Sequence, residues 1–101
     1  MAKVTVSFTA QRDETNILRD LARKAGRAVA ARYAADFDRL YARLGAYPDS
    51  GAPRPKLGKF ARIGIVPPWL FIYDYDAADD AVVVLRAVHG QRRITARLLR
   101  R

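Results

Sequence analysis

The sequence predicts an α+β fold with the element order β-α-α-β-β-β. An N-terminal strand precedes an antiparallel helical hairpin, and the hairpin packs on an antiparallel four-stranded sheet. Three observations support this prediction: an alternating apolar pattern at the N-terminus, two consecutive apolar stripes of helical period, and three β-branched or aromatic runs in the second half. A length of 101 residues suits one domain, expected over residues 1–101.

The N-terminal strand and the first helix follow from local patterns. Apolar residues alternate with polar ones in a short half-buried strand formed by Val4, Val6 and Phe8. A helix is then expected over about residues 10–24, with Thr9 as its N-cap and Gly26 as its stop. Asp13 and Glu14 lie near its first turn, where the helix dipole favours carboxylates.

A second helix follows directly, because apolar residues recur at spacings of three and four. This face is formed by Val29, Tyr33, Phe37, Leu40 and Leu44. Gly45 and Pro48 are expected to end the helix. Two helices joined by so short a connection must run antiparallel, as a helical hairpin.

The second half of the chain is expected to form a loop and three strands. Residues 46–60 contain three prolines and two glycines, which indicate an irregular loop. The strands are expected at residues 61–66, 69–75 and 81–88, and their short connections make them antiparallel neighbours. Regular alternation along the last strand places Arg86 on the same face as Val82 and Val84.

The end of the chain predicts a basic C-terminal tail or a short amphipathic helix. Five arginines lie here: Arg92, Arg93, Arg97, Arg100 and Arg101. They accompany an apolar stripe of Ile94, Leu98 and Leu99. Since one helical hairpin covers one face of a sheet, the other face is expected to stay open or to receive a partner.

The charge of the chain indicates a polyanionic partner. Nineteen Lys and Arg residues against ten Asp and Glu give a net charge of +9 and a pI of about 10.7. Such a balance is typical of proteins that bind nucleic acid or an acidic protein. The alternative is an arginine-rich composition in which many arginines only solvate helix faces.

Other classes of protein are excluded or disfavoured by composition. The absence of Cys excludes disulfides and thiolate metal sites, and makes the cytoplasm the natural compartment. No apolar run approaches the roughly 20 residues that span a membrane, and residues 1–8 lack the apolar block of a signal peptide. We therefore expect no membrane association. No metal-ligand spacing or glycine-rich phosphate loop is present, so no metal and no cofactor are expected.

Three segments in the second half resemble the ParE/RelE superfamily, the toxins of type II toxin–antitoxin systems. The residues that carry the resemblance are Pro48, Gly51, Arg62, Tyr73, Arg86, His89, Gly90, Arg92 and Arg93. The resemblance implies a toxin that arrests growth, stabilises plasmids, and is held silent by a cognate acidic, ParD-like antitoxin in a heteromeric complex. It implies no cofactor.

The two branches of this superfamily differ in target. ParE-like toxins bind DNA gyrase, whereas RelE-like toxins are endonucleases that cut mRNA on the ribosome. The RelE-like branch carries two lysines and an arginine on a strand, and a tyrosine on its last helix. The first of these strand positions is Arg62 here, but the next two fall on Gly64 and Val66, which carry no charge. Cutting RNA needs a base, an acid and a cation for the phosphorane, yet no Tyr, His, Asp or Glu follows Gly90. The resemblance is therefore closer to the ParE branch, and an enzyme is not expected.

Five residues are predicted to bind the target: Arg62, Arg86, His89, Arg92 and Arg93. In the alternative endonuclease, His89 with Arg92 or Arg93 would supply the chemistry, because a histidine titrates in a useful range. His89 has a second interpretation as a local cap of its strand. The C-terminal arginines would grip phosphate or gyrase, or remain a solvated tail.

Five aromatic residues are predicted to contact the antitoxin: Tyr33, Phe37, Tyr41, Trp69 and Tyr73. Along the aromatic strand, Trp69, Phe71, Tyr73 and Tyr75 share one face by alternation. Three interpretations of this face remain open. It packs in the core beneath the helices, it lies beneath an antitoxin segment, or it stacks on nucleic-acid bases.

Overall fold

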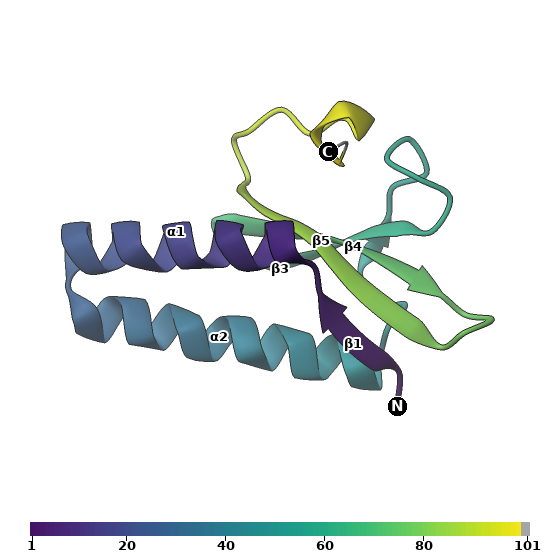
Figure 1. Cartoon of the computed structure of the whole chain (residues 1–101), viewed down its shortest axis with the longest axis horizontal. Helices are drawn as coiled ribbons and strands as arrows, with labels where there is room; N and C mark the ends of the chain where they lie inside the picture. The colour runs from purple at the N-terminus through teal and green to yellow at the C-terminus, as the bar shows by residue number, and fades with distance from the viewer. Residues whose placement is uncertain (100–101) are drawn as a thin grey trace.

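The computed structural model describes residues 1–99. Its elements are the strand β1 (Lys3–Val6), the helices α1 (Phe8–Ala25) and α2 (Arg27–Ala46), the strands β2 (Ala52–Pro53), β3 (Ala61–Val66), β4 (Trp69–Asp76) and β5 (Ala81–His89), and a 3₁₀ turn η1 (Ala96–Leu99). The helical hairpin extends to one side of an open sheet (Figure 1). This order confirms the predicted α+β fold, with the two-residue β2 as an addition.

The sheet is five-stranded and mixed, with the order β1-β5-β4-β3-β2. The strands β3, β4 and β5 are antiparallel neighbours, as their short connections predicted. The expectation of a fully antiparallel, four-stranded sheet is wrong in two respects. The sheet has β2 as a fifth strand, and β1 pairs parallel with β5, with Lys3 opposite Ala81. The helical hairpin carries the chain away from the sheet and back, and a pairing between such distant segments leaves no local signal in sequence.

Helix α1 begins earlier than predicted, and Ser7 rather than Thr9 is its N-cap. The Ser7 hydroxyl accepts a hydrogen bond from the Ala10 N–H at 3.0 Å, which satisfies one free donor of the first turn. The same hydroxyl donates to the Leu85 carbonyl at 3.1 Å. The cap therefore also fastens the start of α1 to β5.

Gly26 ends α1 as predicted and lets α2 start at once. Its φ of +97° lies in a region that residues with a side chain rarely adopt. Its N–H donates to the Ala22 carbonyl at 3.0 Å, which closes the last turn of α1. The chain reverses in this single residue, so the two helices lie antiparallel (Figure 1).

The sheet has an apolar core on each face. Toward the helices, the buried side chains include Phe37, Leu40, Leu44, Phe71 and Tyr73. Within this layer the Phe37 and Phe71 rings meet edge to face with centroids 5.0 Å apart. The aromatic face of β4 is thus core packing, since Trp69 and Tyr75 also pack against this layer.

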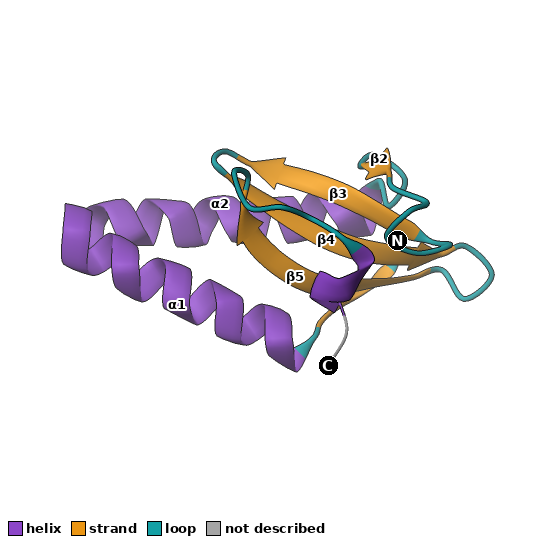
Figure 2. Ribbon diagram, turned by 90° about the horizontal axis from the view of Figure 1, so that it is seen from above, coloured by secondary structure: helices purple, strands orange, loops and turns teal. Residues whose placement is uncertain are grey.

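The C-terminal segment covers part of the opposite face, which the sequence analysis expected to be open or occupied by a partner. The buried residues of this second layer are Ile63, Ile72 and Val88. The side chains packed on them include Leu57, Ile94, Leu98 and Leu99. Figure 2 shows the short C-terminal turn lying over the strands. The predicted short amphipathic helix is therefore a 3₁₀ turn docked on the sheet. The predicted positions Arg100 and Arg101 lie outside the described residues.

A β-bulge changes the expected face of Arg86. Ile72 is opposite Arg86, but the next residue, Tyr73, is opposite Val84, so Leu85 is the extra residue of the bulge. Arg86 therefore lies on the face of its partner Ile72, away from the helix-facing Val84. The prediction that Arg86 shares a face with Val82 and Val84 is wrong, because one extra residue reverses the alternation.

Within residues 1–99, neither helix combines the length and the apolar character that crossing a membrane requires.

Candidate functional site

The loop after α2 is held to the sheet by Tyr73 and Arg62. The Tyr73 hydroxyl donates to the Pro48 carbonyl at 2.8 Å and accepts from the Gly51 N–H at 2.9 Å. Arg62 Nη1 donates to the carbonyls of Asp49 and Gly51 at 2.8 and 2.7 Å. Four residues of the predicted motif thus meet in one hydrogen-bonded group, which we call the loop latch: Pro48, Gly51, Arg62 and Tyr73.

The loop latch requires glycine at its centre and a protonated phenol. A Cβ at Gly51 would lie 2.5 Å from the Tyr73 oxygen and 2.6 Å from the Ile63 carbonyl oxygen. Burial raises the pKa of Tyr73, while the Gly51 hydrogen bond and the Arg62 charge partly offset this. The phenol therefore stays a hydrogen-bond donor at neutral pH. Arg62 also lines an open pocket of about 330 Å³ beside Lys59 and Tyr75.

Arg86 is bound inside the protein. Its Nε and Nη2 donate to the two carboxylate oxygens of Asp13 at 2.7 and 3.2 Å, and its Nη1 donates to the Leu98 carbonyl at 3.0 Å. Asp13 also accepts from the Ala87 N–H at 3.0 Å. The two charged side chains are only 17% and 16% exposed. Arg86 thus joins α1, β5 and the C-terminal segment, and its contact with a target stays a prediction.

Asp13 has a different role in the structure from the one that the sequence predicted. It was expected to interact with the helix dipole, but it neutralises Arg86 and accepts from a backbone N–H of β5. One signal pointed toward such a partner: an arginine in a Val- and Leu-rich strand must either reach solvent or be paired. The identity of the partner depended on the packing of α1 beside β5, which the sequence did not show.

His89 lies against Trp69 where β5 ends. The two residues are cross-strand partners, and their rings meet edge to face with centroids 5.3 Å apart. His89 Nδ1 accepts from the Gln91 N–H at 3.1 Å. In the neutral ring the proton therefore resides on Nε2, which can donate a hydrogen bond but cannot take a further proton while Nδ1 remains the acceptor. The half-buried His89 thus makes the local contact that one of its two interpretations expected.

Arg92 and Arg93 follow His89 and are exposed. The Arg92 N–H donates to the His89 carbonyl at 2.9 Å, which turns the chain back over the sheet. Both arginines line a shallow pocket of about 280 Å³ together with Thr95, Arg97 and Leu98. Three of the five predicted target-binding residues, His89, Arg92 and Arg93, are therefore neighbours at the end of β5. Arg62 belongs to the loop latch, and Arg86 points inward.

Two of the five aromatic residues predicted to contact an antitoxin are core residues. Phe37 and Tyr73 have no exposed surface. Tyr33, Tyr41 and Trp69 are partly exposed and pack at the margin of the helix-facing core. Contact with an antitoxin stays a prediction for all five, and only these last three present surface to a partner.

Tyr41 also ties the two helices together. Its hydroxyl donates to Glu14 Oε2 at 2.9 Å, from α2 to α1. Burial and this hydrogen bond to a carboxylate raise the pKa of Tyr41, so the phenol stays protonated. A partner that binds across Tyr41 therefore meets an ordered hydrogen-bonded pair on the helical hairpin.

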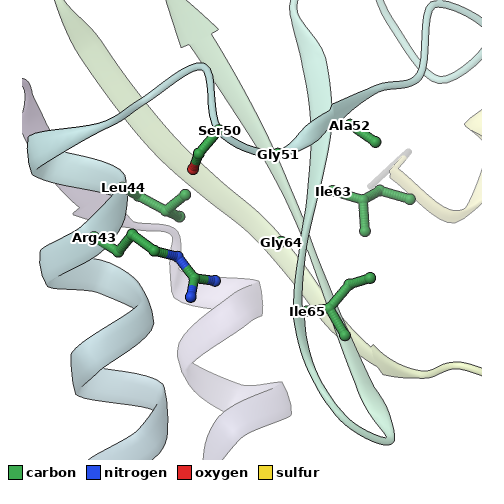
Figure 3. A pocket seen from close by; sticks show the side chains of 8 residues that line it. All are labelled: Arg43, Leu44, Ser50, Gly51, Ala52, Ile63, Gly64 and Ile65. Carbon is green, nitrogen blue, oxygen red and sulfur yellow. The ribbon is translucent and has the colours of Figure 1, made fainter.

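A groove between α2 and β3 was not anticipated from the sequence. Its volume is about 330 Å³, and it is lined by Arg43, Leu44, Ser50, Gly51, Ala52, Ile63, Gly64 and Ile65 (Figure 3). Figure 3 shows Arg43 reaching from α2 toward β3. On the outer edge of β3, β2 pairs only with Arg62 and Ile63. Ile65 is 54% exposed beside that edge. A free strand edge, an apolar side chain and a cation together suit an extended acidic peptide.

The floor of the groove explains the glycine at position 64. A Cβ there would lie 3.1 Å from Leu40 Cδ1, so the bare backbone lets α2 pack closely on β3. The sequence pattern showed only an uncharged position. Its packing role depends on the depth at which Leu40 inserts.

Chains of two solved toxin–antitoxin systems share this fold. A chain of the chromosomal ParDE toxin–antitoxin system of P. aeruginosa superposes with a TM-score of 0.73 at 18% identity, covering 88% of this chain and 96% of that one. A chain of the RelBE2 toxin–antitoxin complex of Mycobacterium tuberculosis superposes with a TM-score of 0.60 at 22% identity, covering 87% and 90%. At these identities the likeness establishes the fold.

The family is shown by sequence. The model of the ParE toxin of the type II toxin–antitoxin system parDE matches residues 4–94, and the chain belongs to this family. The resemblance to the ParE/RelE superfamily is thereby confirmed. Among curated proteins, no sequence matches the chain.

Proposed function

We propose that this type II toxin arrests growth in the cytoplasm by binding DNA gyrase, and that a cognate acidic, ParD-like antitoxin neutralises it in a heteromeric complex. Membership of the ParE toxin family supports the first half of this proposal. The net charge of +9 supports the second, because an acidic partner complements it.

The observation that carries the proposal is the environment of the two β3 positions where RelE-like toxins have charged residues and this chain has none. Gly64 lies beneath Leu40, where even a methyl group is crowded at 3.1 Å. Val66 packs against the helix-facing core. Neither position supplies a cation for a phosphorane, and Arg62 Nη1 is already held by two carbonyls of the loop latch. These contacts favour a toxin that acts by binding.

The geometry of His89 supports the same conclusion. A general base must offer an unprotonated nitrogen to the hydroxyl that it activates. In His89 the unprotonated Nδ1 accepts from the Gln91 N–H, and the ring edge packs against Trp69. The ring is therefore placed to donate a hydrogen bond to a target or to brace the end of β5.

The second candidate function is a ribosome-dependent mRNA endonuclease. It is favoured by one observation: His89, Arg92 and Arg93 are close together along the chain, and both arginines are exposed. Under this alternative a change of tautomer would free a nitrogen of His89, and an arginine would stabilise the phosphorane.

Supercoiling by purified gyrase tests the proposal. The toxin at micromolar concentration is expected to inhibit supercoiling, and a full supercoiling rate at that concentration would contradict gyrase as the target. Toeprinting on translating ribosomes is the parallel assay, and new mRNA ends there would establish the alternative.

A variant pair separates the two functions. His89→Ala is expected to leave gyrase inhibition within a few-fold of the native toxin, whereas the alternative expects it to abolish mRNA cleavage. The exposed neighbour Gln91→Ala is the control, because its side chain makes no hydrogen bond among residues 1–99.

We propose further that the antitoxin folds on the toxin with an extended segment in the groove between α2 and β3. Pull-down by the acidic protein encoded beside the toxin gene tests this. Arg43→Glu in α2 should weaken the complex, because it reverses the charge in the groove. Arg32→Glu, an equal charge reversal at an exposed position of α2 outside the groove, should not.

A further inference from the structure

The segment after β5 separates its apolar and cationic side chains. Ile94, Leu98 and Leu99 pack on the sheet layer of Ile63, Ile72 and Val88. Arg92 and Arg93 precede these residues and Arg97 lies between them; all three arginines are exposed and line one pocket of about 280 Å³ with Thr95. The apolar anchors therefore present three guanidinium groups on a common outer surface.

This segment is fastened to the domain. Arg86 donates to the Leu98 carbonyl at 3.0 Å, and Arg86 is itself fixed by Asp13. The Arg92 N–H donates to the His89 carbonyl at 2.9 Å, and the Leu98 N–H donates to the Thr95 carbonyl at 3.0 Å. A solvated tail would have none of these contacts. Because the contacts already order the segment, its arginines lose less conformational entropy when they bind a ligand.

The positive charge of the pocket is not compensated. No Asp or Glu occurs in the sequence after Asp80. The ion pairs found among residues 1–99 involve Arg23, Lys24, Arg39 and Arg86, and none involves an arginine of the pocket. Asp13, the carboxylate that reaches β5, is already neutralised by Arg86. An anion at this pocket meets three exposed arginines that form no ion pair among residues 1–99.

The chemistry of the pocket suits a phosphodiester backbone. Guanidinium groups bind phosphate oxygens through paired hydrogen bonds and stay charged at any physiological pH. Among residues 1–99, no aromatic side chain lines the pocket, so this part of the chain gives it no stacking platform of the kind on which proteins hold single-stranded bases. Contacts to phosphate alone carry no sequence information and suit a duplex.

We propose that Arg92, Arg93 and Arg97 bind the phosphate backbone of duplex DNA directly, without sequence preference. This DNA contact goes beyond the gyrase contact of the proposed function, and the DNA contact does not depend on gyrase being the target. A toxin that holds DNA by this surface would be concentrated where a DNA-bound target works.

Fluorescence anisotropy with a short labelled duplex of mixed sequence tests the proposal. If each arginine neutralises one phosphate, log K should fall with log salt at a slope of about −2.7, or about 40-fold between about 50 and 200 mM salt. The triple variant Arg92→Gln, Arg93→Gln, Arg97→Gln should lose most of this slope, roughly one unit for each arginine. The duplex should bind at least as tightly as the corresponding single strand.

The matched control removes the same charge elsewhere. Arg19, Arg27 and Arg32 are exposed on the helical hairpin, and their triple change to Gln lowers the net charge equally. This variant should keep nearly the native affinity and slope. Equal losses in the two triple variants, tighter binding of the single strand, or no duplex binding at low salt would each overturn the proposal. Circular dichroism of both variants checks that each is folded.

The outcome is separable from that of the gyrase proposal. A toxin that inhibits supercoiling but does not bind free duplex refutes the DNA contact and leaves the gyrase target intact. A toxin that binds duplex through the three arginines but never inhibits gyrase supports the DNA contact and refutes the target.

Discussion

Replacing Asp13 by Ala is expected to destabilise the toxin strongly, because it leaves Arg86 without its counter-charge. Breaking a fully buried ion pair from one side costs about 3–5 kcal/mol. Here the two side chains are 17% and 16% exposed, so water recovers part of that cost. The Ala87 N–H also loses its acceptor, which adds about 1 kcal/mol. We expect a fall of about 2–4 kcal/mol in the free energy of unfolding, a large part of the roughly 5–15 kcal/mol typical of a domain.

Urea unfolding followed by circular dichroism measures this loss, with Asp20→Ala as the matched control. Asp20 pairs with Arg23 and Lys24 in α1, but these side chains are more than half exposed. Its removal should cost less than about 1 kcal/mol. If Asp13→Ala costs no more than Asp20→Ala, the assignment of Asp13 and Arg86 as the internal clamp of the domain is refuted.

A double-mutant cycle makes the test specific to the pair. Arg86→Ala alone should also be costly, since it leaves the Asp13 carboxylate unpaired and frees the Leu98 carbonyl. The double variant should cost less than the sum of the two single changes, with a coupling energy of about 1–3 kcal/mol. Additive losses would show that the two charges do not stabilise each other.

Three further sites have defined expectations. Gly51→Ala should lower the free energy of unfolding by about 2–4 kcal/mol, measured by urea unfolding, because its Cβ would lie 2.5 Å from the Tyr73 oxygen and would displace the loop latch; an unchanged midpoint would contradict this. Ser7→Ala should cost about 1–2 kcal/mol in thermal unfolding and Thr9→Ala only a few tenths, because Ser7 is the N-cap; equal effects would reject that assignment. Burial raises the pKa of Asp74, so its charged form opposes folding, and Asp74→Asn should stabilise the domain at pH 7. That gain should shrink as the pH falls through the carboxyl pKa, where Asp74 is itself neutral, and a gain independent of pH would contradict the cause.

The order of elements was predictable because each rests on a local pattern. The spacing of Phe37, Leu40 and Leu44 identified the buried face of α2, and all three are core residues. Gly26 was also predictable as a helix stop from a local pattern, because glycine adopts a positive φ more readily than other residues. The structure shows this φ at Gly26, where the chain reverses. Patterns of this kind need no knowledge of which segments meet in space.

The features that the sequence missed depend on contacts between distant segments. The parallel pairing of Lys3 with Ala81 joins β1 to β5, two strands that are far apart in the sequence. The bulge at Leu85 reverses the face of Arg86 without any proline or glycine to mark it. The apolar stripe of the C-terminal segment predicted that Leu98 would be buried. The stripe did not show which surface of the protein Leu98 would cover.

The candidate site was predictable as a set of residues but less so as a set of roles. Arg62 and Tyr73 were expected at functional surfaces, and they hold the loop latch together. Arg92 and Arg93 were expected to face a target, and they are exposed. Arg62 and Tyr73 differ from Arg92 and Arg93 because their side chains lie close enough to the loop carbonyls to donate hydrogen bonds to them. That proximity depends on the packing of the loop, which the sequence does not show.

The state of plasmid DNA and of mRNA in the same arrested culture tests the central claim most directly. If the toxin acts on gyrase by binding, plasmids extracted after its induction should be relaxed or broken while mRNA ends remain those of an uninduced culture. Normally supercoiled plasmids together with new mRNA ends at ribosomal positions would contradict the gyrase target and establish an endonuclease.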